Sequence, residues 1–237
     1  MICCAKSLLK NGQWDIIEDN RLTVLVSEDF QMNERFYTLP PEKQQQIINA
    51  GFRVFSQNSY KKSPMQEIAD EAGISKSLLF HYFRNKKELY LFLWDKAADI
   101  TVEYLTKNHC YECTDLFEMM ERGMHAKIRI MCRYPDIAAF AMKAFYEKDT
   151  AVCEDIQRSY RAHFDQKAAG ALAGLDPDAF IPGLDLKMMH RQIYLMSVGY
   201  LWEISQRGEV LEAERLEKDF SQMLAFWKNV YLRKCEK

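Results

Sequence analysis

The chain has 237 residues, a formal net charge of −2 and 48% hydrophobic residues, so it can bury a sizeable core in one large domain or two small ones. With only nine glycines and six prolines against abundant Leu, Met, Lys, Glu, Gln and Ala, the composition predicts an all-α fold. The weak net charge excludes a basic nucleic-acid coat, and no run approaches the roughly 20 apolar residues of a membrane span. We expect a cytoplasmic protein.

The first 38 residues are predicted to be an N-terminal extension. Residues 1–31 resemble nothing else in the chain, and they end directly before Met32. Two interpretations stay open: a real extension, or a start codon assigned too early, with Met32 as the physiological start. A peptide covering residues 1–31 in the natively expressed protein would exclude the second.

Helical patterning begins at Pro40. The apolar residues from Ile47 to Phe55 recur at the 3.6-residue period and end near Asn58. A second helix is predicted at 63–73, with Ser63 as N-cap, Pro64 at the first position and Gln66 in a capping-box position. Gly73 is expected to end it in the left-handed conformation.

Two more helix starts follow. Ser75 can cap a short helix that runs through Phe83, and Asn85 with Glu88 repeats the capping pattern before a long helix to about Lys107. Further helices are predicted at 115–134, 135–148, 150–171, 185–206 and 211–234, with turn chemistry at 174–185.

The two short helices at 63–83 have the pattern of a helix-turn-helix unit. A small apolar core is expected to lock them together: Ile68, Ala69, Ala72, Leu79 and Phe83. The second helix begins with small polar residues, which would leave its first turn exposed to a major groove. A plain αα-hairpin has the same spacing of helices and turn. The spacing alone therefore does not distinguish it from a helix-turn-helix.

Charge is unevenly distributed along the chain. Residues 32–89 hold nine Lys/Arg against six Asp/Glu, although the whole chain is slightly acidic. A mildly basic module on an acidic body is compatible with local DNA contact.

The stretch EIADEAGISKSLLFHYF at 67–83, with NKKEL at 85–89 after it, resembles the N-terminal module of the TetR family of transcriptional regulators. The resemblance implies a helix-turn-helix DNA-binding domain at 39–85 and a helical ligand-binding and dimerisation domain at 86–237. It also implies DNA contacts from Ser63, Ser75, Lys76, Ser77, Leu78, Phe80, His81, Tyr82 and Lys86. Ser77 and Leu78 replace the family's frequent Gly-Thr pair, which leaves the operator sequence open.

The resemblance further implies a homodimer, and two helices have suitable composition. The segments 185–206 and 211–234 are apolar over a wider arc than one core stripe requires. Burial inside a monomer is the alternative interpretation.

A small-molecule effector, apolar or amphipathic, is the remaining expected partner beside operator DNA. Candidate pocket residues are Met120, Met124, Arg122, His125, Phe145, Tyr146, Phe164, Tyr194 and Trp202. Arg122, His125 and Arg129 could hold an anionic head group. Ordinary core packing, or a solvated face for the charged residues, explains the same pattern.

No catalytic motif appears, so we expect no enzyme activity. Cys110 and Cys113 have a CxxC spacing, but no second ligand pair accompanies them, and we expect neither a metal nor another cofactor. The competing functional class is a helical adaptor that binds protein instead of DNA.

Overall fold

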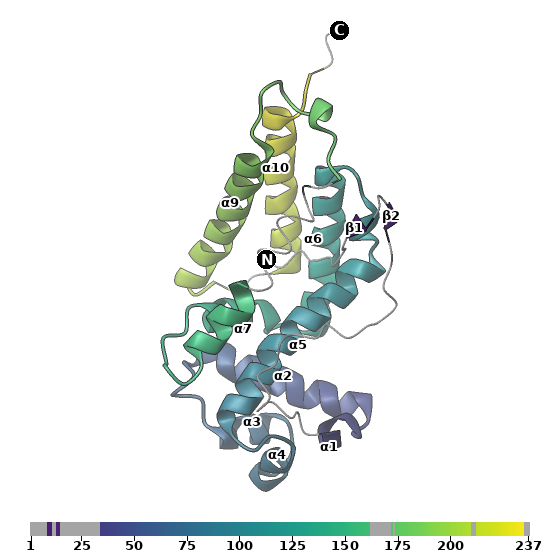
Figure 1. Cartoon of the computed structure of the whole chain (residues 1–237). Coiled ribbons are helices and arrows are strands. Elements are labelled where there is room, and N and C mark those ends of the chain that lie inside the picture. The colour runs from purple at the N-terminus through teal and green to yellow at the C-terminus, as the bar shows by residue number, and fades with distance from the viewer. Residues whose placement is uncertain are drawn as a thin grey trace. The chain divides into compact units, whose positions relative to one another are not determined.

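The structure is a computed structural model that describes residues 9–10, 13–14, 34–161, 172, 174–209 and 212–234. It confirms the predicted all-α fold: apart from a two-residue antiparallel pair, β1 (Leu9–Lys10) and β2 (Gln13–Trp14), regular structure in the described residues is helical (Figure 1). The chain forms two compact units. One holds described residues 34–99 and 133–161, and the other holds 100–132 with the described residues from 172 onward.

The first unit contains the predicted helix-turn-helix. Its helices are α1 (Glu34–Tyr37), α2 (Pro41–Gln57), α3 (Met65–Glu71), α4 (Lys76–Tyr82), most of α5 (Lys86–Lys107), α7 (Ile137–Phe145) and a helical stretch at 153–161. The short α1 was not predicted from the sequence. It belongs to this unit because its Phe36 is fully buried, so the packed module begins upstream of residue 39. The division at 85 and 86 stays a prediction about functional domains.

Aromatic rings form the core under the helix-turn-helix. The rings of Phe36, Phe83 and Phe92 lie 5.0–5.3 Å apart in every pairing, and Leu79 is fully buried as well. Nearby, α2 approaches α5 so closely that a Cβ at Gly51 would lie 2.5 Å from a buried Leu93 methyl. The predicted core residues Ile68, Ala69, Ala72, Leu79 and Phe83 are all buried.

The turn between α3 and α4 is a Schellman motif. The N–H of Gly73 donates to the Asp70 carbonyl at 3.1 Å, and the N–H of Ile74 donates to the Ala69 carbonyl at 3.0 Å. Gly73 has φ +65°, as expected for the left-handed residue of this motif. The turn therefore satisfies the last carbonyls of α3 and fixes the direction in which α4 departs.

The predicted caps are partly confirmed. The Ser75 hydroxyl accepts the Leu78 N–H at 3.1 Å, and the Asn85 side chain accepts the Glu88 N–H at 2.9 Å. The predicted capping box at Ser63 is wrong. In the structure α3 begins at Met65 with Pro64 as N-cap, and the buried Ser63 hydroxyl donates to the Ser59 carbonyl at 2.9 Å instead.

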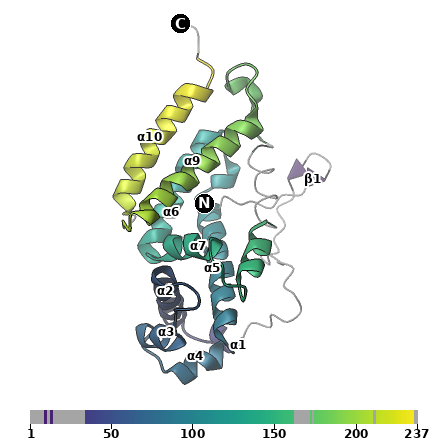
Figure 2. The same ribbon diagram turned by 90° about the vertical axis from the view of Figure 1, so that its left-hand side faces the viewer.

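The second unit contains the last turns of α5, the 3-10 turns η1 (Cys110–Glu112) and η2 (Pro177–Ala179), α6 (Leu116–Arg133), α9 (Leu186–Gln206) and α10 (Ala213–Tyr231). Helices α9 and α10 lie side by side (Figures 1 and 2). Their shared core with α6 is Leu116, Phe117, Phe180, Met189, Ile193, Leu224 and Trp227. Two backbone hydrogen bonds tie the segment before α9 to the end of α10: Ile181 N–H to Tyr231 at 2.9 Å, and Arg233 N–H to Ala179 at 3.0 Å.

The predicted helix positions match the observed ones to within a few residues. Helices expected at 115–134, 135–148, 185–206 and 211–234 appear as α6, α7, α9 and α10. Of the helix predicted at 150–171, residues 153–161 are helical and most of the rest lies outside the described residues, as does Met32. Within the described part of the chain, no helix has the length and apolarity to cross a membrane.

Replacing Gly73 with alanine is expected to destabilise the protein by about 1 kcal/mol, because an L-residue with a Cβ is strained at positive φ. No atom lies within 4 Å of the position of that Cβ, so the loss comes from the backbone alone. Urea unfolding followed by circular dichroism measures it. Gly73→Asn is the matched control and should lose less, since Asn tolerates the left-handed region. An unchanged midpoint for Gly73→Ala would contradict this explanation.

Candidate DNA-binding interface

Helix α4 separates its residues into a buried and an exposed side. Leu79 and Tyr82 are buried at 0% and 7% exposure. The other predicted contact residues of this helix and its cap are exposed: Ser75, Lys76, Ser77, Leu78, Phe80 and His81. Two of these are large apolar side chains, Leu78 and Phe80, which are 37% and 40% exposed. An apolar side chain left in water on a recognition helix is available to contact a thymine methyl group.

The start of α4 carries a small hydroxyl cluster. Besides capping the helix, the Ser75 hydroxyl lies 3.0 Å from the Ser77 hydroxyl. Lys76 is exposed between them. Ser77 thus contacts the cap of α4. It is one of the two residues that replace the frequent Gly-Thr pair of the family that the sequence resembles.

Two predicted contact residues are buried in the structure. Ser63 has no exposed surface, and its hydroxyl serves the turn before α3. The ring of Tyr82 packs edge-on near Phe36, with the ring centres 6.3 Å apart. Both residues therefore help to hold the module together, and their contact with phosphate stays a prediction.

Lys86, the predicted phosphate-binding lysine, lies at the first position of α5 and also holds the turn before α3. Its ammonium donates to the carbonyl oxygens of Tyr60 at 2.8 Å and Lys61 at 3.2 Å, and lies 4.6 Å from the Tyr60 ring centre. Burial lowers the pKa of Lys86, and the nearby Asp149 opposes that shift. An ammonium carries three donors, so these two bonds leave the capacity to bind a phosphate.

Helix α7 and the residues just after it are tied to the end of α2 and to the turn before α3 by polar contacts that the sequence did not reveal. The Glu147 carboxylate accepts the Tyr60 N–H at 2.7 Å, and the Lys143 ammonium donates to the Ser56 carbonyl at 3.0 Å. These partners are more than 80 residues apart in the chain. The segment between α2 and α3 is thus held both by Lys86 of α5 and by Glu147, which follows α7.

The predicted pocket residues fall into the two units. Phe145 and Tyr146 belong to the first unit, where the Phe145 ring lies 4.8 Å from Tyr146 and 4.6 Å from Tyr160. In the second unit Met124 is buried, Met120 packs on the α6–α9–α10 core, Tyr194 is half-buried and Trp202 is 40% exposed. Phe164 lies outside the described residues. Their common role as a pocket stays a prediction.

The charged candidates on α6 pair with protein groups. Arg122 donates to the Glu118 carboxylate at 2.6 Å and to the His109 carbonyl at 3.2 Å, and Arg129 donates to Asn108 at 2.7 Å. His125 lies 3.8 Å from the Glu217 carboxylate. These side chains are substantially exposed, so the structure favours the solvated-face interpretation over an anion site.

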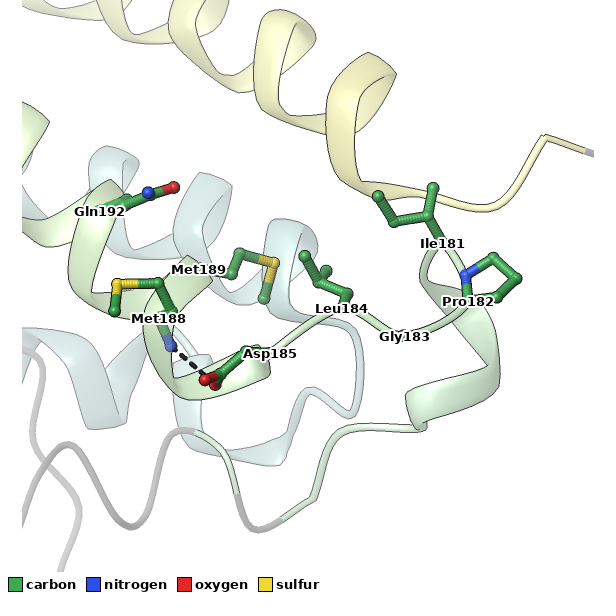
Figure 3. A pocket seen from close by; sticks show the side chains of 8 residues that line it. All are labelled: Ile181, Pro182, Gly183, Leu184, Asp185, Met188, Met189 and Gln192. Carbon is green, nitrogen blue, oxygen red and sulfur yellow. Dashed lines mark hydrogen bonds between the residues drawn. The ribbon is translucent and has the colours of Figure 1, made fainter.

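A hollow of about 300 Å³ opens in the second unit, at the start of α9. Figure 3 shows the side chains of Met188, Met189 and Leu184 around it, and Asp185 caps α9 by accepting the Met188 N–H at 3.0 Å. For the segment at 174–185 the sequence predicts only turns. The lining is mainly apolar, and none of the nine predicted pocket residues belongs to it.

The CxxC pair lies in η1 and the residue after it. Cys110 is buried and Cys113 partly so, and burial raises the pKa of the Cys113 thiol. The described residues contain no group of three or more His, Cys, Asp or Glu arranged to hold a metal ion.

Comparison with known proteins agrees with this geometry. The family model for bacterial regulatory proteins of the tetR family matches residues 47–92, from α2 into α5. The matched segment, which contains the helix-turn-helix, is thus similar to the tetR family. Its predicted family resemblance is confirmed.

Two curated relatives differ in how much of this chain they match. The transcriptional activator FasR of Mycolicibacterium smegmatis is 40% identical over 68 residues, which are 28% of this chain and 31% of FasR. The transcriptional regulator RutR of Escherichia coli K12 is 24% identical over 183 residues, covering 74% of this chain and 85% of RutR. The chain therefore spans about a third of FasR but most of RutR.

Solved structures share the fold. A TetR-family regulator from Chloroflexus aurantiacus has a TM-score of 0.59 at 22% identity, covering 85% of this chain and 98% of that one. FadR from Bacillus subtilis, solved in complex with stearoyl-CoA, has a TM-score of 0.56 at 17% identity, covering 76% and 96%.

Replacing Lys86 with alanine is expected to weaken DNA binding on all sequences and to reduce the slope of log affinity against log salt by about one unit, because one phosphate contact is lost. Lys107→Ala is the charge-matched control: Lys107 ends the same 22-residue helix, about 30 Å away, and pairs with Glu103 at 2.5 Å. Fluorescence anisotropy over a salt series measures both. An unchanged slope of log affinity against log salt for Lys86→Ala would show that Lys86 does not contact a phosphate.

Proposed function

We propose that this chain is a DNA-binding transcriptional regulator that binds its operator as a homodimer and is released by a small molecule, and so acts as a repressor. The observation that supports this function best is that α4 has a buried and an exposed side. Leu79 is fully buried, whereas five residues around it are exposed: Lys76, Ser77, Leu78, Phe80 and His81. This exposed set lies within the segment that matches the family.

The exposed side of α4 offers both kinds of DNA contact. Lys76 supplies a cation for phosphate, which fixes register without carrying sequence information. His81, Ser77 and the apolar pair Leu78 and Phe80 supply hydrogen-bonding groups and methyl-binding surface for base edges. The expected preference includes thymine opposite the apolar pair.

Exposed apolar side chains on α9 and α10 support the homodimer. On α9, Met188, Leu195 and Trp202 recur every seven residues and are 52%, 51% and 40% exposed. On α10, Phe226 and Val230 are one turn apart and 57% and 40% exposed. Apolar stripes on neighbouring helices are typical of an interface in which the same surface of two copies meets. A dimer would place two recognition helices for half-sites about 34 Å apart.

Release by an effector follows from a difference in its affinity for two states of the protein. A route is offered by Lys143 of α7, which bonds the end of α2 at Ser56, and by Glu147 just after α7, which bonds the turn before α3 at Tyr60. A shift of α7 would act on both. Stearoyl-CoA in the related FadR structure is an amphipathic ligand, which supports the apolar or amphipathic effector class expected here.

Selection from a random duplex library by the full-length chain is expected to return a palindromic site with half-sites one helical turn apart. The reason is that the two recognition helices of a dimer enter successive major grooves on the same side of the duplex. Affinity for that duplex should fall steeply with salt. Recovery of no preferred sequence and no salt-sensitive DNA binding would contradict the proposal and favour the helical adaptor instead.

Replacing Phe226 with glutamate is expected to raise the dimer dissociation constant at least about 100-fold, since each copy would bury an unpaired carboxylate. Sedimentation velocity measures the monomer fraction. Ser221→Glu adds the same charge at an exposed position on another side of α10 and should leave the dimer intact. A Phe226→Glu protein that stays dimeric would place the interface elsewhere.

A further inference from the structure

Arg35 lies in α1, upstream of the segment that matches the family, yet its side chain reaches the recognition helix. Its Nη1 atom lies 3.2 Å from Nδ1 and 3.1 Å from Nε2 of His81. Both side chains are exposed. The two residues are 46 positions apart in the chain, so only the tertiary fold brings them together.

The two distances define the kind of contact. The Cε1–H group stands between the two ring nitrogens, so an atom in the ring plane could not approach both nitrogens this closely without colliding with it. The guanidinium nitrogen therefore lies over the imidazole face. Arginine stacks readily on ring faces because its guanidinium is planar and weakly hydrated.

The position of Arg35 is fixed by its neighbours in α1. Phe36, the next residue, is fully buried, and its ring lies 5.3 Å from Phe83 and 6.3 Å from Tyr82, the residue that follows His81. On the other side, the Tyr37 ring lies 5.7 Å from the Lys96 ammonium on α5. The backbone that carries Arg35 is thus anchored in the same core as the end of α4.

We propose that Arg35 is a specificity-determining positioning residue: it holds the His81 ring in one orientation for base reading. This inference rests on the proposed DNA-binding function. An exposed histidine on a helix samples several rotamers, and fixing it before binding lowers the entropy lost when it meets a base edge. The set of residues that determine base recognition therefore includes Arg35 of α1, which lies outside the helix-turn-helix.

A positioning role differs measurably from a phosphate contact. If Arg35 acts through His81, its removal lowers affinity for the preferred sequence alone and has no effect once His81 is gone. If Arg35 binds phosphate, its removal weakens binding to every sequence and flattens the salt dependence.

The test is a double-mutant cycle on the duplex that the wild-type chain selects, with a scrambled duplex of equal length for comparison. The variants are Arg35→Ala, His81→Ala, the double variant and Arg35→Lys, which keeps the charge but loses the guanidinium plane. We expect Arg35→Ala to lose roughly three- to tenfold in affinity for the selected duplex and nothing on the scrambled one. The double variant should bind no worse than His81→Ala, and Arg35→Lys should not restore binding.

Base selection gives a second readout. Repeating the selection with Arg35→Ala and with His81→Ala should relax the preference at the same base positions. Additive losses, an equal loss on the scrambled duplex, full rescue by Arg35→Lys, or unaltered base preference in Arg35→Ala would each overturn the inference. A wild-type chain that selects no sequence would instead overturn the proposed function, and the two failures are therefore distinguishable. Thermal melting of each variant checks that it is folded.

Discussion

The exposed side of α4 depends on one packing constraint, the burial of Leu79 within this helix and of Phe83 directly after it. Phe83 meets Phe36 and Phe92 in a three-ring contact with centres 5.0–5.3 Å apart. Because a helix turns by a fixed angle per residue, burying these two side chains decides the direction of every other residue on α4. Lys76, Ser77, Phe80 and His81 reach solvent as a consequence.

That constraint is supported from both ends of the module. The Schellman motif at Gly73 sets where α4 starts, and Phe36 in α1 closes the core where α4 ends. Lys86 and Glu147 hold the turn before α3 through backbone groups, which are bonded wherever they are buried. The helix-turn-helix therefore has defined attachment points, and Glu147, just after α7, contacts one of them.

Local sequence patterns predicted the elements well because their determinants are local. The positive φ of Gly73, the cap at Ser75 and the pair of Asn85 with Glu88 each depend on a few neighbouring residues. The prediction at Ser63 failed because another local hydrogen bond competes with the cap. A serine before a proline is typical of an N-cap, but here its hydroxyl donates to the Ser59 carbonyl, four residues earlier in the chain.

Sequence by itself determined the all-α fold, the helix-turn-helix and most of the exposed side of α4, since apolar periodicity and turn chemistry are properties of short segments. Only the tertiary structure decided which candidates are buried, as Ser63 and Tyr82 are, and which pair with distant protein groups, as Arg129 does with Asn108. It also decided the contacts between distant segments: Arg35 with His81, and Glu147 with Tyr60. Such pairs leave no local pattern, because each depends on two segments meeting through a core that neither one specifies alone.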